Sequence, residues 1–204
     1  MSPFTLKYLA KFIVEYDVAF LSINGGPMPM RDIKLNDLVE LKLRDSGLYS
    51  EDIFILAQAL KQNNSLQKID LSKNCIGYTY VEERKLLEIK MKNQERLRDS
   101  TFEQLFYNSL GIEHFAIAFS ETDRIKVLDL SENDIGSQNF SLLMKVFRSN
   151  TKIDTLNVAD CRLDGSCAEE LCGILKEHNE KLNLLKFRNS PLGERGAMAI
   201  ADLI

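Results

Sequence analysis

Apolar and polar residues follow one another in the same order at several places along the chain. In the segment IKVLDLSENDI, which starts at Ile125, apolar residues stand at offsets 0, 3, 5 and 10, and a small polar residue stands at offset 8. The alternation around offsets 3 and 5 predicts a short, half-buried strand. The same pattern starts at Leu38, Leu66, Ile153 and Leu182, and a looser version starts at Val18.

A second pattern, typical of a helix, follows these strand patterns. Two large apolar residues stand four positions apart, so that they share one face of a helix. The pairs are Leu56/Leu60, Phe115/Phe119, Leu143/Phe147, Leu171/Leu175 and Ile200/Ile204. The chain is therefore expected to repeat a unit of strand, loop, helix and turn about every 28 residues, which indicates a leucine-rich repeat solenoid.

In its repeats the chain resembles the ribonuclease-inhibitor-like subfamily of leucine-rich repeat proteins, over about residues 18–204. The segment NSPLGERGAMAIADLI, residues 189–204, matches that subfamily best, with Gly193 and Gly196 ahead of the helix. The resemblance implies an α/β fold, a leucine-rich repeat solenoid in the shape of a horseshoe. A parallel sheet would form its inner face and helices its outer face.

The residue at offset 8 has a structural reason in such a repeat. After each strand the chain must bend toward the helix layer, and the bend leaves buried backbone groups without partners. We expect an amide side chain inside the bend to bond these groups in its own repeat and in the next. A serine can do part of this and a thiol does it weakly, whereas the alternative is an ordinary surface turn. The residues of this ladder are Ser46, Asn74, Asn133, Cys161 and Ser190.

The spacing of the repeats also predicts how the chain is organised. Residues 1–37 are expected to hold an N-terminal capping helix, at 2–16, and a short first repeat, and residues 38–204 the other repeats. The step from Leu66 to Ile125 is about twice the usual one, which indicates a charged, helical insertion at about 78–110 that projects from the rim. We expect an open sheet edge at the C-terminal end, covered by further chain or by a partner.

Composition narrows the class of protein. The chain has 204 residues, of which 45% are hydrophobic, and a formal net charge of −4, which predicts one globular domain. The acidic balance and the lack of a basic stripe argue against nucleic-acid binding, and no uncharged apolar run has the length of a membrane span. Because the N-terminus does not read as a signal peptide, we expect an intracellular, cytoplasmic protein without membrane insertion.

No set of residues in the sequence predicts catalysis or a cofactor, so we do not expect an enzyme. The two histidines, His114 and His178, belong to different repeats, and we expect His114 at the surface. The four cysteines lack CxxC spacing and are interpreted as reduced, mostly buried thiols. The alternative is a metal site made of Cys161, Cys167, Cys172 and His178. It is disfavoured because ligand pairs normally lie closer in the sequence.

Side chains at offsets 2, 4 and 6 point away from the core, because those at offsets 3 and 5 point into it. They map the inner, concave face, whose centre is acidic and polar and whose flanks are basic. The alternative is an ordinary solvated sheet face. The residues expected to bind a protein partner there are Phe20, Lys42, Arg44, Lys68, Asp70, Val127, Asp129, Asn157, Leu184, Lys186 and Arg188.

These features favour a non-catalytic protein-interaction or scaffold module within a larger assembly. Its partners would bind the concave face, the insertion at 78–110 or the open C-terminal edge. By analogy with other leucine-rich repeat proteins, the assembly is expected to be cytoskeletal or ciliary. One alternative is a regulator of a small GTPase, because the repeats resemble those of the Ran GTPase-activating protein. Another is a fragment of an innate-immune sensor, since similar repeats end such receptors.

Overall fold

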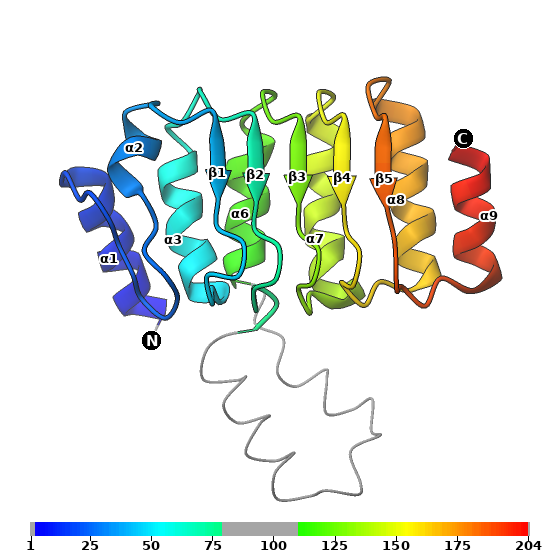
Figure 1. Cartoon of the computed structure of the whole chain (residues 1–204), viewed down its shortest axis with the longest axis horizontal. Helices are drawn as coiled ribbons and strands as arrows, with labels where there is room; N and C mark the ends of the chain where they lie inside the picture. The colour runs from blue at the N-terminus through cyan, green and yellow to red at the C-terminus, as the bar shows by residue number, and fades with distance from the viewer. Residues whose placement is uncertain (1–2, 79–109, 204) are drawn as a thin grey trace, which may run out of the picture.

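The computed structural model describes residues 3–78 and 110–203. Five short strands stand side by side, and a row of helices lies behind them (Figure 1). The elements are α1 (Pro3–Glu15), α2 (Met30–Lys34), β1 (Glu40–Lys42), α3 (Ser50–Leu60), β2 (Lys68–Asp70), α6 (Leu110–Ser120), β3 (Val127–Asp129), α7 (Gly136–Ser149), β4 (Thr155–Asn157), α8 (Gly165–His178), β5 (Leu184–Lys186) and α9 (Gly193–Leu203).

The five strands form one parallel sheet in chain order, β1-β2-β3-β4-β5. Behind the sheet, α3, α6, α7, α8 and α9 pack in the same order, each against the next (Figure 1). The central residues of the strands lie opposite one another across the sheet: Leu41, Ile69, Leu128, Leu156 and Leu185. The prediction of an α/β leucine-rich repeat solenoid is thereby confirmed.

The core is a layer of apolar side chains between the sheet and the helices. In β1 to β4 the central residue of each strand is buried and its two neighbours are more exposed, as a period of two requires. On the helix side, the largest fully buried side chains include Phe115, Phe119, Phe140 and Phe147. Because burial of aromatic side chains is a large favourable contribution to folding, these residues of α6 and α7 stabilise the middle of the solenoid.

A sharp bend follows each strand, and near its start a residue adopts the left-handed conformation. These residues, each directly before a ladder position, are Asp45, Lys73, Glu132, Asp160 and Asn189, with φ between 53° and 57°. This conformation costs a residue with a side chain about 1–2 kcal/mol, although aspartate and asparagine tolerate it better than most. Each bend therefore needs hydrogen bonds within it to keep its shape.

The side chains of Asn74 and Asn133 are buried inside two of these bends. Asn133 Nδ2 donates to the carbonyl oxygen of Leu130 in its own repeat, at 2.9 Å, and to that of Leu71 in the preceding repeat, at 2.8 Å. Asn74 makes the equivalent bonds, and its Oδ1 also accepts the N–H of Ser46 at 3.0 Å. Each amide thus joins two neighbouring repeats.

The other ladder residues bond less. The Cys161 thiol lies 3.0 Å from the carbonyl oxygen of Leu130, and the Ser46 hydroxyl lies 3.4 Å from that of Arg44 in its own repeat. The Ser190 hydroxyl is buried without a hydrogen-bond partner among the described residues. The expectation that Ser190 shares in the ladder is therefore wrong, because its side chain is shorter than an amide and does not reach the carbonyl groups of the bend.

A second row of asparagines, which was not expected, lies at the other end of the strands, where each helix turns back toward the sheet. Asn63, Asn150 and Asn179 are buried there, three residues before the strand pattern of the next repeat. Each donates through Nδ2 to a backbone carbonyl about one repeat earlier, at 2.6, 3.2 and 2.9 Å respectively. The strands are therefore tied to their neighbours at both ends.

The N-terminal end of the solenoid consists of α1 and an irregular segment. Ile13 of α1 is buried in the core, and α1 packs against α3. Instead of a strand from Val18, the structure has an isolated antiparallel bridge between Leu21 and Met28, followed by α2. The glycines between these two residues allow the chain to turn back on itself, so residues 18–28 add no strand to the sheet.

The two described ends of the expected insertion meet at Ser50, the first residue of α3. The N–H of Ser50 donates to the carbonyl oxygen of Tyr78 at 2.8 Å, and the N–H of Gly111 donates to Ser50 Oγ at 3.0 Å. Residues 79–109, which make up almost all of the expected insertion, lie outside the described residues. Because α6 begins beside Ser50, it takes the helix position of its repeat, between α3 and α7 (Figure 1).

We predict that Asn133→Ala lowers the free energy of unfolding by about 1–3 kcal/mol, because it leaves buried carbonyl groups without donors. Urea unfolding followed by circular dichroism measures the change. Asn183→Ala is the matched control, since this exposed asparagine precedes β5, and we expect it to stay within about 0.5 kcal/mol of the parent chain. Equal stabilities for the two variants would contradict the structural role of Asn133.

We also predict that the solenoid folds without residues 79–109. A two-residue Gly-Ser link should replace them, because both flanking segments already bond to Ser50. Tyr78 is kept, since its hydroxyl donates to Asp134 Oδ2 at 2.9 Å. The shortened chain should keep its circular dichroism spectrum and one cooperative thermal transition. A broad, non-cooperative transition would show that 79–109 belong to the core.

Candidate protein-interaction surface

The solvent face of the sheet is a grid of side chains in three rows, because the strands lie in register and are about 4.8 Å apart. The first row is Glu40, Lys68, Val127, Thr155 and Leu184. The second row is Lys42, Asp70, Asp129, Asn157 and Lys186. The third row, directly after the strands, is Arg44, Ser72, Ser131, Ala159 and Arg188. Ten of the eleven residues predicted for the concave face lie in this grid.

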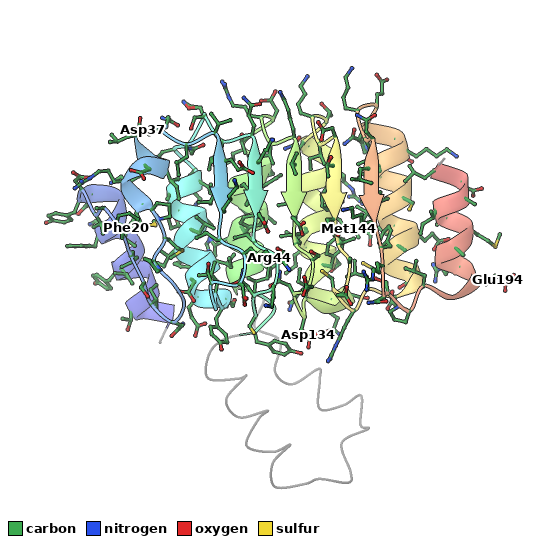
Figure 2. All side chains as sticks on the ribbon, in the orientation of Figure 1. Phe20, Asp37, Arg44, Asp134, Met144 and Glu194 are labelled. Atoms are coloured by element: carbon green, nitrogen blue, oxygen red, sulfur yellow. The ribbon has the colours of Figure 1, made fainter. Side chains whose placement is uncertain are left out.

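Phe20 is the exception. Its side chain is 63% exposed, but it lies in the irregular segment before α2 and on none of the five strands. Figure 2 shows Phe20 near α1 and α2, beyond the β1 edge of the sheet. The placement of Phe20 on the concave face is therefore wrong, for the reason that the segment from Val18 forms a bridge with Met28 nearby rather than a strand.

The middle of the grid is held by hydrogen bonds between its own side chains. Asp129 Oδ1 accepts the N–H and the hydroxyl of Ser131, at 2.9 and 2.6 Å, and Asp70 binds Ser72 in the same way. Asn157 Nδ2 donates to Asp129 Oδ2 at 2.8 Å. Asp129 therefore has both oxygens engaged, whereas the bonds of Asp70 to described residues go to its Oδ1. Since no described residue bonds to Asp70 Oδ2, this oxygen can accept a donor from a partner.

Arg44 crosses the lower part of the grid (Figure 2). Its Nη1 donates to Ser72 Oγ at 2.7 Å and its Nη2 to Glu132 Oε1 at 2.7 Å, so that one side chain connects three repeats. The hydrogen bond to Glu132 raises the pKa of the guanidinium above its already high usual value. Because Arg44 bonds within the protein, it is a positioning residue of this surface more than a free cation for a partner.

In the first row Glu40 pairs with Lys42 of the second row at 3.1 Å, and the other four side chains form no side-chain hydrogen bond or ion pair with a described residue. Val127 is half-buried and Leu184 is 43% exposed, with Thr155 between them. The side chains of Lys68 and of Lys186, in the second row, are exposed, and neither forms an ion pair with a described residue. This part of the surface can therefore take apolar and acidic groups from a partner, while Asp70 can take a basic one.

The C-terminal edge of the sheet is more exposed than the rest. Leu185 and Phe187 point toward the core but are half-buried, whereas the equivalent residues Leu156 and Val158 of the previous repeat are buried. Within the described residues β5 pairs with β4 alone. Whether a partner covers this edge stays a prediction.

The structure does not bring the candidate metal ligands together. In the described part of the chain no three His, Cys, Asp or Glu side chains form a cluster that could hold a metal ion. Burial raises the pKa of the Cys161 and Cys167 thiols to about 12, and that of Cys172 to about 11. His114, expected at the surface, is instead half-buried, and its ring makes an edge-to-face contact with that of Phe54, with the ring centroids 4.5 Å apart.

No helix in the described ranges combines the length and the apolar character needed to cross a bilayer. Comparison with known proteins then gives three kinds of match. The family model "Leucine Rich repeat" matches residues 62–79 and 125–138. Among solved structures, leiomodin-1 actin-binding site 2 matches with a TM-score of 0.58 and 17% identity, covering 86% of this chain and 84% of that one. At this identity the likeness concerns the fold.

Curated relatives match over the repeats. Human NACHT, LRR and PYD domains-containing protein 13 is 30% identical over 129 residues, which are 63% of this chain and 12% of that protein. Human NACHT, LRR and PYD domains-containing protein 5 is 27% identical over 182 residues, or 87% of this chain and 15% of that protein. Ribonuclease inhibitor of Sus scrofa is 27% identical over 165 residues, or 79% and 35%. The chain thus spans a small part of the length of each.

The state of the thiols yields a prediction. The pKa of each buried thiol is about 11 or 12, so less than about 1% of it is ionised at pH 8. The thiolate is the reactive form. Iodoacetamide should therefore modify the half-buried Cys75 first, and Cys161, Cys167 and Cys172 only after unfolding. Peptide mass spectrometry after timed alkylation measures this order. Rapid native alkylation of Cys161 would contradict its buried place in the ladder.

Proposed function

Since the chain is a leucine-rich repeat protein of the ribonuclease-inhibitor-like kind, we propose that it is a protein-interaction module that binds its partner on the concave face and performs no catalysis itself. Repeats of this kind generally bind proteins. The observation that carries the proposal is the division of the grid. Its lower rows are largely bonded internally, whereas the first row presents Lys68, Val127 and Leu184 to solvent.

The grid favours an extended partner segment with mixed chemistry. Val127 and Leu184 are two strands apart, about 10 Å, with Thr155 between them. Apolar side chains of the partner pack on these two residues and carry most of the binding energy, as buried apolar anchors generally do. A basic side chain of the partner binds Asp70, and acidic groups approach Lys186 and Arg188. Charge complementarity of this kind sets the orientation of the partner more than its affinity.

A cytoskeletal assembly is the more specific form of the proposal. The likeness to leiomodin-1 actin-binding site 2 extends over 86% of this chain, and that structure is named for its binding of actin. Actin is therefore the first partner to test, by co-sedimentation with filaments and by binding to monomers. A ciliary assembly and the regulation of a small GTPase remain alternatives. A GTP-hydrolysis assay over a small panel of GTPases distinguishes the last of these, because a scaffold leaves the rates unchanged.

We predict that Val127→Arg weakens binding of the partner by about tenfold or more, because a charged side chain replaces an apolar anchor. Affinity capture from source cells with quantitative mass spectrometry identifies the partner, and calorimetry with the purified partner gives the change in Kd. Ile117→Arg is the matched control. Ile117 is an apolar residue of α6, on the opposite side of the sheet, and is 40% exposed.

The two variants separate the concave face from the helical face. Loss of the same captured protein in Val127→Arg, with Ile117→Arg unchanged, is the expected result. Equal binding by both variants, or loss in Ile117→Arg alone, would overturn the proposed site. Co-sedimentation with actin that is insensitive to Val127→Arg would likewise place actin binding elsewhere.

A further inference from the structure

A pocket lies at the rim of the solenoid, where α3, α6 and α7 turn into β2, β3 and β4 (the upper edge in Figure 1). Its volume is about 280 Å³. Four charged residues line it, Asp123, Arg124, Lys126 and Lys152, and all four are exposed. Because these residues precede the strands, the pocket lies at the opposite end of the sheet from the bends that follow the strands. We call it the rim pocket.

The three cations of the rim pocket are not engaged within the protein. Arg124, Lys126 and Lys152 form no ion pair and no side-chain hydrogen bond with a described residue. Arg44 on the concave face differs, because its guanidinium binds Glu132 at 2.7 Å. An anion that enters the rim pocket therefore gains its interactions without competing with an ion pair of the described residues.

The rim pocket is positive although the chain as a whole is acidic. Its lining has three cations and one carboxylate, which leaves a charge of +2. The complete turns that form it, residues 62–68, 121–127 and 149–155, have four cations and three carboxylates, which leaves +1. The equivalent turn of the first repeat, 34–40, has a charge of −1, and the whole chain has −4. The pocket therefore attracts anions, with a modest strength that salt reduces.

The neutral residues of the pocket add one free donor and a fixed wall. The Gln67 side chain makes no hydrogen bond with a described residue, so its amide can donate to a ligand. Ser65 and Asn64 belong to the wall, because the Ser65 hydroxyl donates to the carbonyl oxygen of Leu38 and the N–H of Asn64 donates to Asn36 Oδ1, at 2.6 Å each. This part of the pocket keeps its shape without a ligand.

The size and the charge of the pocket indicate the kind of ligand. A volume of about 280 Å³ is just below the range of sites that enclose a small molecule, so the pocket has room for one or two side chains of a larger partner. Three cations in one pocket, without a basic stripe around them, are too few for a nucleic acid. The carboxylates between the cations do not suit an anionic membrane surface. Acidic side chains of a protein match both the size and the charge.

We propose that the rim pocket binds acidic side chains, aspartate or glutamate, of a partner protein. The Arg124 guanidinium binds one carboxylate through two parallel hydrogen bonds, the geometry that this pair of groups favours. Lys126 and Lys152 act as point charges on a neighbouring acidic residue, and Gln67 donates a further hydrogen bond. The site lies beyond the concave face proposed above, and it does not depend on a partner being bound there.

NMR titration of the ¹⁵N-labelled full chain with a short glutamate-rich peptide tests the proposal, at about 50 mM salt because exposed charges are screened less there. The expected result is saturable shift changes at the backbone amides of Gln67, Arg124, Lys126 and Lys152. The same peptide with glutamine in place of glutamate should cause none. Since the test needs no partner of the concave face, its outcome is independent of the function proposed above.

Matched variants test whether the pocket itself attracts the peptide. Lys152→Gln should raise the Kd of the glutamate peptide by about threefold or more, and Arg124→Gln by about fivefold or more, because it removes the bidentate pair. Lys181→Gln is the control and should leave the Kd unchanged. Lys181 is exposed and holds the place of Lys152 in the next repeat, but it does not line the pocket. Circular dichroism should show the same fold in every variant, since the changed residues are exposed.

A glutamate peptide that causes no shift changes at these amides would overturn the proposal. So would equal weakening by Lys152→Gln and Lys181→Gln, because the attraction would then come from the total charge of the protein. A phosphoserine peptide provides the remaining comparison. If it binds through Arg124 while the glutamate peptide does not bind, the pocket takes phosphate groups and its assignment to carboxylates is wrong.

Discussion

The need to satisfy buried backbone groups at every turn governs this structure. Each repeat leaves its strand through a left-handed residue, and in the first four bends the N–H of this residue still donates to the next repeat. The bend behind it buries further backbone groups that need partners. Asn74 and Asn133 fill their bends with amide groups that bond to two repeats at once. Cys161 reaches one carbonyl of the previous repeat and one of its own, through the weaker hydrogen bonds of a thiol. The registry of the sheet, and with it the concave face, depends on these bonds.

The second row of asparagines adds the same constraint at the opposite ends of the strands. With amide bonds at both ends, three-residue strands are sufficient to keep five repeats in register. The side chains on the concave face then stand in straight rows, because each occupies the same offset of its repeat. Surface chemistry in such a protein is therefore set by the choice of residue at a few offsets.

Much of this could be predicted from the sequence because it repeats. The alternation of Leu128 and Leu130, and the place of Asn133 after them, recur in other repeats, so each occurrence supports the others. A second asparagine recurs three residues before the strand pattern, at Asn63, Asn150 and Asn179. This repetition is the same kind of signal, but it lies in the turn before the strand, outside the pattern from which the repeats were recognised. No pattern in the sequence indicates the hydrogen bond from Arg44 to Glu132, since these residues are 88 positions apart.

The errors lie where the repeat pattern weakens. Phe20 was placed on a strand because its segment fits the offsets loosely, but the glycines and prolines that follow favour a turn, and Leu21 pairs with Met28. At the other end, Ser190 occupies a ladder position without making a ladder bond. Both positions lie near an end of the solenoid, where a repeat has one neighbour instead of two and the period constrains the chain less.

The most direct test of the account is native-state hydrogen exchange at the amides that the ladder binds. The N–H groups of Ser46 and Leu48 donate to Asn74 Oδ1, each at 3.0 Å, although they belong to the preceding repeat. In Asn74→Ala these two amides should lose protection by about tenfold or more, while that of Leu156 in β4 changes little. Unchanged protection at Ser46 and Leu48 would contradict the claim that the asparagine ladder joins one repeat to the next.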